Sequence, residues 1–150
     1  TKVGILLSYF QINPNDSVKS KEAYSLLDIL QTTHPTQAKA SAIYGDFLNR
    51  DNKLLEAREK FRQSIQLDKG RYLVWNQVMM LNLQLADFDD LLIESIEAID
   101  LFPSQPSFYY FKSLALSQKQ NNKEAIEVLN VMINITFEII YPIFHLIICF

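Results

Sequence analysis

Apolar residues recur at helical spacing along most of the chain, and short polar turns separate the helical stretches. Between Ser17 and Thr32, Ala23, Leu27 and Leu30 form an i, i+4, i+7 stripe. Asp16 or Ser17 can cap this stretch, and His34-Pro35 ends it. The same pattern predicts further helices in pairs, over the ranges 38–50 and 54–68, 72–85 and 88–101, and 106–120 and 123–138. The sequence therefore predicts an all-α fold.

Small and aromatic residues return at an interval of 34 residues when the ranges 38–71, 72–105 and 106–139 are aligned. The fourth positions of the three ranges are Ser41, Trp75 and Tyr109, the eighth are Gly45, Met79 and Ser113, and the twentieth are Ala57, Leu91 and Ala125. A period of about 34 residues built from two helices is typical of a repeat array. In such an array each unit packs only against its neighbours and leaves a long concave face free.

These positions resemble the tetratricopeptide repeat, whose pattern has a large residue, then Leu-Gly, then Tyr, and later Ala, Phe, Ala and Pro. The residues that carry the resemblance are Tyr44-Gly45, Leu48, Ala57 and Phe61 in the first range, Trp75, Phe88, Ala98 and Pro103 in the second, and Tyr109, Leu116, Ala125 and Leu129 in the third. The three ranges cover 102 of the 150 residues without an insertion. The resemblance implies a right-handed α-solenoid of antiparallel helix pairs.

We expect about four helix pairs, of which the first is degenerate. A frame set back by one period, over 4–37, puts Ala23 in the alanine column and Pro35 in the proline column. Pro14 would break the first helix of that unit, so residues 1–37 are interpreted as a cap-like repeat. The regular repeats are expected over 38–71, 72–105 and 106–139, followed by an apolar tail at 140–150, all in one structural domain.

Side-chain size predicts how closely the two helices of each pair approach. Gly45 and Ala57 are small, which favours a close crossing in the first regular repeat, and Ser113 with Ala125 favours the same in the third. In the second repeat the corresponding residues are the larger Met79 and Leu91. We therefore expect either a wider separation of that pair or a different angle between its helices.

The end of the chain is unusually apolar. Residues 131–150 contain one acid, Glu138, and neither lysine nor arginine. A membrane-spanning helix needs about 20 apolar residues, and Glu138 and Pro142 interrupt this stretch, so a membrane segment is not expected. Two alternatives are open: the tail folds back onto the last repeat, or residues 128–150 pack against a second copy of the chain to form a homodimer.

Composition and candidate chemistry argue against several function classes. The net charge is −3 with acids and bases interspersed, whereas nucleic-acid binding would need a basic stripe. His34, His145 and Cys149 have no catalytic neighbour in the repeat frame, and no glycine-rich phosphate loop occurs. The acids of 87–90 suit a helix cap better than a cation site. We therefore expect no enzyme activity, metal or cofactor.

The sequence leaves the compartment open. The chain begins at Thr1 rather than at methionine, so we expect a cut upstream of it, which would remove the usual targeting signal from view. Arrays of the kind that this chain resembles occur in the cytoplasm, in the periplasm and on lipid anchors.

The candidate binding surface consists of helix positions opposite the expected buried positions 4, 7, 8 and 11 of each repeat. The chosen groove residues are Lys39, Asp46, Asn49, Arg50, Asn76, Met80, Gln84, Tyr110, Leu114, Ser117 and Gln118, and the same positions also include Ala42, Leu73, Leu83 and Ser107. Amides such as Asn76 can bond a ligand backbone, Tyr110 and Met80 can hold an apolar side chain, and Arg50 can meet a carboxylate.

The resemblance implies a scaffold that binds a protein or peptide in this groove. It does not extend to the clamp that grips acidic chaperone tails, because Ala42 stands where that clamp has Lys and Asp46 stands where it has Asn. The alternative function is a structural module that self-associates through the apolar C-terminal segment.

Overall fold

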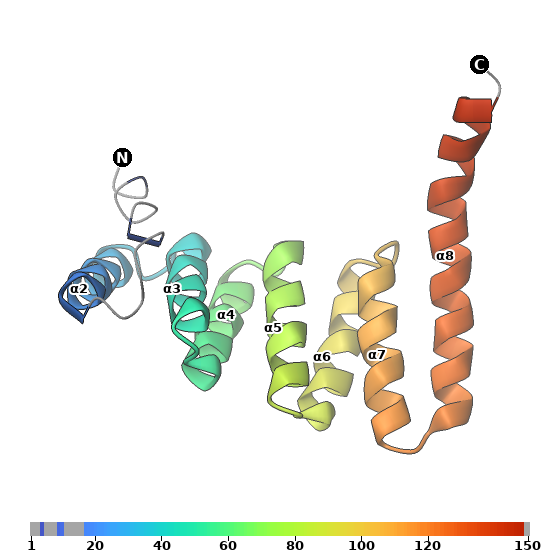
Figure 1. Ribbon diagram of the computed structural model, residues 1–150, viewed down its shortest axis with the longest axis horizontal. Coiled ribbons are helices and arrows are strands. Elements are labelled where there is room, and N and C mark those ends of the chain that lie inside the picture. The colour runs from blue at the N-terminus through green and yellow to red at the C-terminus, as the bar shows by residue number, and fades with distance from the viewer. Residues whose placement is uncertain (1–3, 5–8, 11–16, 149–150) are drawn as a thin grey trace. The chain divides into compact units, whose positions relative to one another are not determined.

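The described part of the chain is helical throughout. The computed structural model describes residues 4, 9–10 and 17–148, and for residues 141–148 it describes the backbone alone. The helices are α2 (Ser17–Thr33), α3 (Ala38–Arg50), α4 (Leu54–Leu67), α5 (Tyr72–Gln84), α6 (Phe88–Leu101), α7 (Pro106–Gln118) and α8 (Asn122–Ile148) (Figure 1). Up to α7, the bounds agree with the predicted ranges to within two residues.

The chain divides into two compact units, Thr1–Val78 and Met79–Phe150, and the division falls inside α5. The first unit contains α2, α3, α4 and the first half of α5, and the second contains the rest of α5 with α6, α7 and α8. Each unit is described by itself below. The predicted repeat boundaries at residues 37, 71, 105 and 139 stay predictions.

The turn inside each regular helix pair has the same backbone geometry. Asn52, Ala86 and Gln120 adopt positive φ angles of 57°, 55° and 62°, and they stand 34 residues apart. In each turn the next backbone N–H bonds back to a carbonyl five residues earlier, as Lys53 does to Leu48 at 2.9 Å. This is the Schellman arrangement that ends a helix and satisfies its last carbonyls. The 34-residue period is therefore a period of the backbone as well as of the side chains.

The large residue at the fourth position of a repeat has a defined role in the structure. The indole N–H of Trp75 donates to the carbonyl of Lys69 at 2.9 Å, and the hydroxyl of Tyr109 donates to the carbonyl of Pro103 at 2.9 Å. Both acceptors lie six residues earlier, in the turn that precedes the helix. These bonds fix the turn that leads from one helix pair to the next and satisfy carbonyls that the helix ends leave open.

The core of the first unit lies between α3 and α4, with α2 packed against α3. A Cβ added to Gly45 would lie 2.8 Å from two carbons of the Phe61 ring, and Phe61 is fully buried. Ala57 is also fully buried, so the predicted close crossing of this pair is confirmed. Ala23 and Leu27 of α2 pack against Phe47 of α3.

The core of the second unit includes a cluster of Leu116, Ala125 and Val128 on α7 and α8, against which Leu92 and Tyr109 pack. Met79 and Leu91, the large residues of the second repeat, are completely buried. The amide of Asn82, which is also fully buried, donates to the carboxylate of Glu94. A polar pair at this depth fixes the register of α5 against α6, because a shifted register would leave the amide without its acceptor.

The end of α8 differs from the expectation. The sequence predicts a helix to residue 138 and a separate tail, but α8 is one helix of 27 residues from Asn122 to Ile148, and it extends beyond the end of α7 (Figure 1). Pro142 lies inside it and has no backbone N–H to donate, yet the helix continues through it to Ile148. The continuous helix leaves no turn at which residues 140–148 could fold back onto α7, so that alternative is wrong for the described residues. Among those residues, no helix has the length and apolar character needed to cross a membrane.

Candidate protein-binding face

The predicted groove residues lie on the exposed sides of α3, α5 and α7. The expected buried positions are covered, as Gly45, Met79 and Leu116 show. We use the name A-helix face for these residues and describe each unit's part by itself. The first-unit part consists of Lys39, Asp46, Asn49, Arg50, Leu73 and Asn76, and the second-unit part of Met80, Leu83, Gln84, Ser107, Tyr110, Leu114, Ser117 and Gln118, all exposed or half-buried. Ala42 does not belong to the face, because its small side chain is buried.

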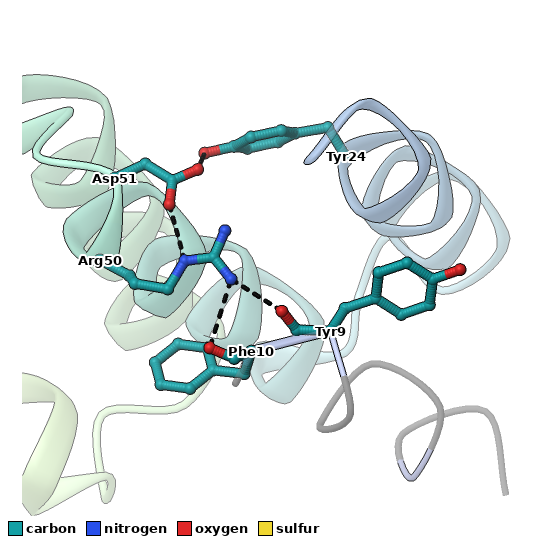
Figure 2. Close-up of polar contacts among 5 residues, drawn as sticks. All are labelled: Tyr9, Phe10, Tyr24, Arg50 and Asp51. Carbon is teal, nitrogen blue, oxygen red and sulfur yellow. Dashed lines mark hydrogen bonds and ion pairs between the residues drawn. The ribbon is translucent and has the colours of Figure 1, made fainter. Parts of the chain in front are cut away.

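Arg50 has a different role from the predicted one. Its guanidinium donates to the carbonyls of Tyr9 at 2.9 Å and Phe10 at 3.4 Å, and its Nε donates to the carboxylate of Asp51 at 2.6 Å (Figure 2). The guanidinium also lies over the rings of Phe10 and Phe47. Sequence reasoning assigned Arg50 to a ligand carboxylate; in the structure it holds the chain's own backbone and an internal carboxylate.

Asp51 connects this arginine to α2. The Tyr24 hydroxyl donates to its second carboxylate oxygen at 2.8 Å (Figure 2), and the Lys53 ammonium lies 4.3 Å from the centre of the Tyr24 ring. Burial by itself would raise the pKa of Asp51, but hydrogen bonds from Arg50 and Tyr24 hold it below its ordinary value. Burial and the bond to Asp51 raise the pKa of Tyr24 well above its usual value. These contacts form a network that joins α2, the end of α3 and residues 9–10.

Among the residues of the A-helix face, Asp46 has the most strongly shifted pKa. Desolvation by the surrounding protein raises the pKa of its carboxyl to about 6, although the residue as a whole is exposed to water. A carboxylate in this environment disfavours a second negative charge beside it. An acidic group of a ligand is therefore disfavoured next to Asp46.

The second-unit part of the A-helix face carries no charged side chain. Tyr110 is 47% exposed and Met80 is 44% exposed, and amides and hydroxyls from Gln84, Ser117 and Gln118 accompany them. Lys112 and Lys119 of the same region are paired with Glu124 and Asp89. This part of the face thus combines apolar contact area with uncharged hydrogen-bonding groups.

The remaining candidate chemistry has structural explanations or lies outside the described residues. The carboxylate of Asp87 accepts a bond from the backbone N–H of Asp90 at 3.3 Å, so the capping interpretation of 87–90 is confirmed. Among the residues that the structure describes, no group of three histidine, cysteine or acidic residues could hold a metal ion. His34 is exposed in a turn. The side chain of His145 and all of Cys149 fall outside the described part.

Two features of this region escaped the sequence analysis. The third and tenth positions of the repeats are buried, as Phe47, Val74 and Phe108 show, although only positions 4, 7, 8 and 11 were expected inside. A broader apolar stripe on each first helix was the available signal. The contact of Arg50 with Tyr9 and Phe10 had no such signal, because the partners are about 40 residues apart in the sequence.

Solved structures similar to this chain include three of MamA. One crystal structure of MamA matches with a TM-score of 0.71 and 16% identity, over 80% of this chain and 70% of the other. The fold is that of a tetratricopeptide-repeat protein. A second MamA structure matches with a TM-score of 0.70 and 16% identity, over 82% of this chain and 67% of the other. MamA MSR-1 C2 matches with a TM-score of 0.66 and 14% identity, over 79% and 68%.

No protein-family model matches the sequence, and no curated protein matches it either. MamA is itself a tetratricopeptide-repeat protein. At 14–16% identity the likeness concerns the fold. The comparisons therefore place the fold of this chain among tetratricopeptide-repeat architectures.

Proposed function

We propose that this chain is a non-enzymatic protein-interaction scaffold that binds a peptide segment on its A-helix face. The observation that carries the proposal is the exposure of Tyr110 and Met80 among uncharged polar side chains on α5 and α7. Aromatic residues and methionine are enriched where proteins bind one another, and the fully buried centre of such interfaces is depleted of charge. The second-unit part of the face has this composition.

The chemistry of the face indicates the kind of peptide. An apolar side chain of the ligand would lie against Tyr110 and Met80, and Gln84 and Gln118 would bond its backbone. The face residues of the second unit are uncharged, so they form no ion pair with an acidic or basic ligand. The expected ligand is therefore a segment with apolar side chains and little net charge in the part that contacts α5 and α7.

The test is selection of peptides from a random displayed library against the full chain, followed by measurement of Kd. In the double variant Tyr110→Ala, Met80→Ala, the selected peptides should bind about tenfold more weakly or worse, because central aromatic contacts contribute more than 1 kcal/mol each. The matched control is Ile93→Ala, Ile96→Ala, which removes exposed apolar side chains from α6 instead. Equal losses in both double variants, or no selected peptide, would contradict the proposal.

A second candidate function, self-association through the C-terminal segment, is favoured by one observation. The exposed side chains of α8 include Ile126, Ile133 and Ile140, on a helix that extends past α7. Apolar surface left in water is a common mark of an interaction site.

A further inference from the structure

Tyr9 and Phe10 lie on the first unit in the way that a bound peptide would. Both residues have helical backbone, and their carbonyls accept bonds from the Arg50 guanidinium at 2.9 and 3.4 Å (Figure 2). The Phe10 ring meets the Phe47 ring edge to face, with 5.3 Å between the ring centroids. Tyr9 packs against the cluster that contains Ala23 and Phe47. We call residues 9 and 10 the Tyr9–Phe10 turn.

The surface that receives this turn is held in place by other residues. The Nε of Arg50 donates to the carboxylate of Asp51 at 2.6 Å, and the Tyr24 hydroxyl donates to the second oxygen of that carboxylate at 2.8 Å. The guanidinium also lies 4.8 Å from the centre of the Phe47 ring. We call Tyr24, Phe47, Arg50 and Asp51 the Arg50 site. Because Arg50 has these partners on α2 and α3, it keeps its direction without the turn, and a site formed in advance binds at a low cost in conformational freedom.

The contacts that the Tyr9–Phe10 turn itself supplies are open to water. Phe10 is 39% exposed, and the Tyr9 hydroxyl donates to Glu22 at 3.1 Å on the surface. Segments held by few buried contacts and by exposed hydrogen bonds open most readily. The completely buried side chains at this junction, Ala23 and Phe47, belong to α2 and α3 and not to the turn. Release of the turn therefore removes no fully buried side chain from the core of the first unit.

The chemistry of the Arg50 site indicates which segments fit it. A guanidinium has several N–H donors and no acceptor, and basic side chains bond the carbonyls of a last helical turn, where these have no partner inside the helix. The Phe47 ring and the face of the guanidinium both favour an aromatic side chain. Asp51 already pairs with Arg50, so the ligand needs no carboxylate. The segment that fits is the last turn of a helix that carries an aromatic residue.

We propose that the Arg50 site is a second docking site, for such an aromatic helix end of a partner protein, and that the Tyr9–Phe10 turn occupies it within the same chain. A partner has to displace the turn before it binds. The turn acts at an effective concentration of about millimolar order, as tethered ligands do, so it excludes weak ligands and yields to tight ones. The Arg50 site lies in the first unit and does not depend on peptide binding at Tyr110 and Met80 of the second.

The test measures the Kd of the full chain for a fluorescent synthetic peptide with the sequence of residues 1–12. In the opened variant Tyr9→Ala, Phe10→Ala, the peptide should bind about tenfold more tightly than in the parent, because the competing turn has lost its aromatic contacts. The matched control Val18→Ala, Ile29→Ala removes exposed apolar side chains from α2 instead and should bind like the parent. Equal affinity of parent and opened variant, or no binding by the opened variant, would overturn the proposal.

Two further changes locate the bound peptide. Phe10→Ala within the peptide should weaken its binding to the opened variant about tenfold, and this change cannot affect the fold of the protein. Arg50→Lys, added to the opened variant, should weaken binding to a similar extent, because lysine lacks the planar fork. Helical circular dichroism shows whether this triple variant is folded. Peptide binding that survives both changes would contradict the assignment to the Arg50 site.

The origin of the turn and the independence of the two binding sites have their own readouts. Sedimentation equilibrium should give the same mass for the parent and the opened variant. A parent dimer that dissociates in the opened variant would show that a second copy supplies the turn, which contradicts its assignment within the chain. Tyr110→Ala, Met80→Ala, added to the opened variant, should leave the Kd for the residue 1–12 peptide unchanged. A weaker Kd there would place this peptide on the A-helix face and overturn the second site, whereas peptides selected from the library test the A-helix face alone.

Discussion

In α3–α4, Gly45 lies against the ring of Phe61, whereas in α7–α8 the same two repeat positions hold Ser113 and Leu129. The turns of both pairs have the same geometry, but their outer surfaces differ. Position 28 is buried in the first pair and exposed in the second. The comparison shows that the repeat positions build the pair, while the neighbours of the pair decide which of its surfaces remain available for binding.

The largest effect is expected at the crossing of α3 and α4. Gly45→Val would add three carbons at a position where a single added Cβ would already lie 2.8 Å from the Phe61 ring, which is fully buried. The free energy of unfolding, measured with urea, should fall by about 3 kcal/mol or more. Ser113→Ala, at the same repeat position of α7, should change it by less than about 1.5 kcal/mol. A fully stable Gly45→Val variant would show that α3 and α4 do not approach as described.

The next largest change in the free energy of unfolding is expected at the end of α3, in contrast to the end of α7. Arg50→Ala removes bonds to Asp51, Tyr9 and Phe10 and should lower the free energy of unfolding by about 2 kcal/mol. Gln118 has the same repeat position in α7 but is exposed, so Gln118→Ala should cost less than about 0.5 kcal/mol. Arg50→Lys should not restore stability, because lysine lacks the planar fork. Equal effects at both positions would contradict the structural role of Arg50.

The sequence was sufficient for the helix pairs because their signals are local. Pro103, Pro106 and the apolar spacing mark helix ends within a few residues of where they occur. The sequence was insufficient where a distant segment determines the role of a side chain. Arg50 was assigned to a ligand carboxylate, but in the structure it donates to the carbonyls of Tyr9 and Phe10. The last helix was expected to end at residue 138, yet α8 continues through Pro142 to Ile148. One lost backbone bond there does not outweigh the remaining bonds of a long helix.

A stabilising change is expected in the turn between α7 and α8. Gln120 adopts a φ of 62°, a conformation that costs a residue with a Cβ about 1 kcal/mol and glycine almost nothing. Gln120→Gly should therefore raise the free energy of unfolding by about 1 kcal/mol, and the melting temperature should rise with it. Asn52→Gly, in the equivalent turn of α3–α4, should be nearly neutral because asparagine already tolerates this conformation. A loss of stability in Gln120→Gly would mean that the turn geometry is not shared.

The smallest effect concerns the charge on Asp46. Its pKa of about 6 exceeds the ordinary value of 3.8, so the folded chain binds the proton more tightly than the unfolded chain. The free energy of unfolding should fall as the pH rises from about 4 to about 6 and then level off. Asp46→Asn should remove that fall and gain less than about 1 kcal/mol at pH 7, because the side chain is exposed to water.

At about pH 2.5, below both the folded and the unfolded pKa of this carboxyl, Asp46→Asn and the parent should have equal stability. Leu114→Ala provides the contrast, since it changes the same repeat position of α7 without a titrating group. Any change in the free energy of unfolding that Leu114→Ala causes should be independent of pH. A pH-independent effect of Asp46→Asn would show that the carboxyl titrates normally.

The most direct measurement is an NMR titration of the isotope-labelled full chain with one selected peptide, followed by the backbone amide shifts. Binding on the second-unit part of the A-helix face predicts that the largest changes occur around Met80, Gln84 and Tyr110, and that the amides of Ile126, Ile133 and Ile140 on α8 do not shift. Changes centred on Ile126 to Ile140, or spread evenly over the chain, would contradict the assignment of peptide binding to the face formed by α5 and α7.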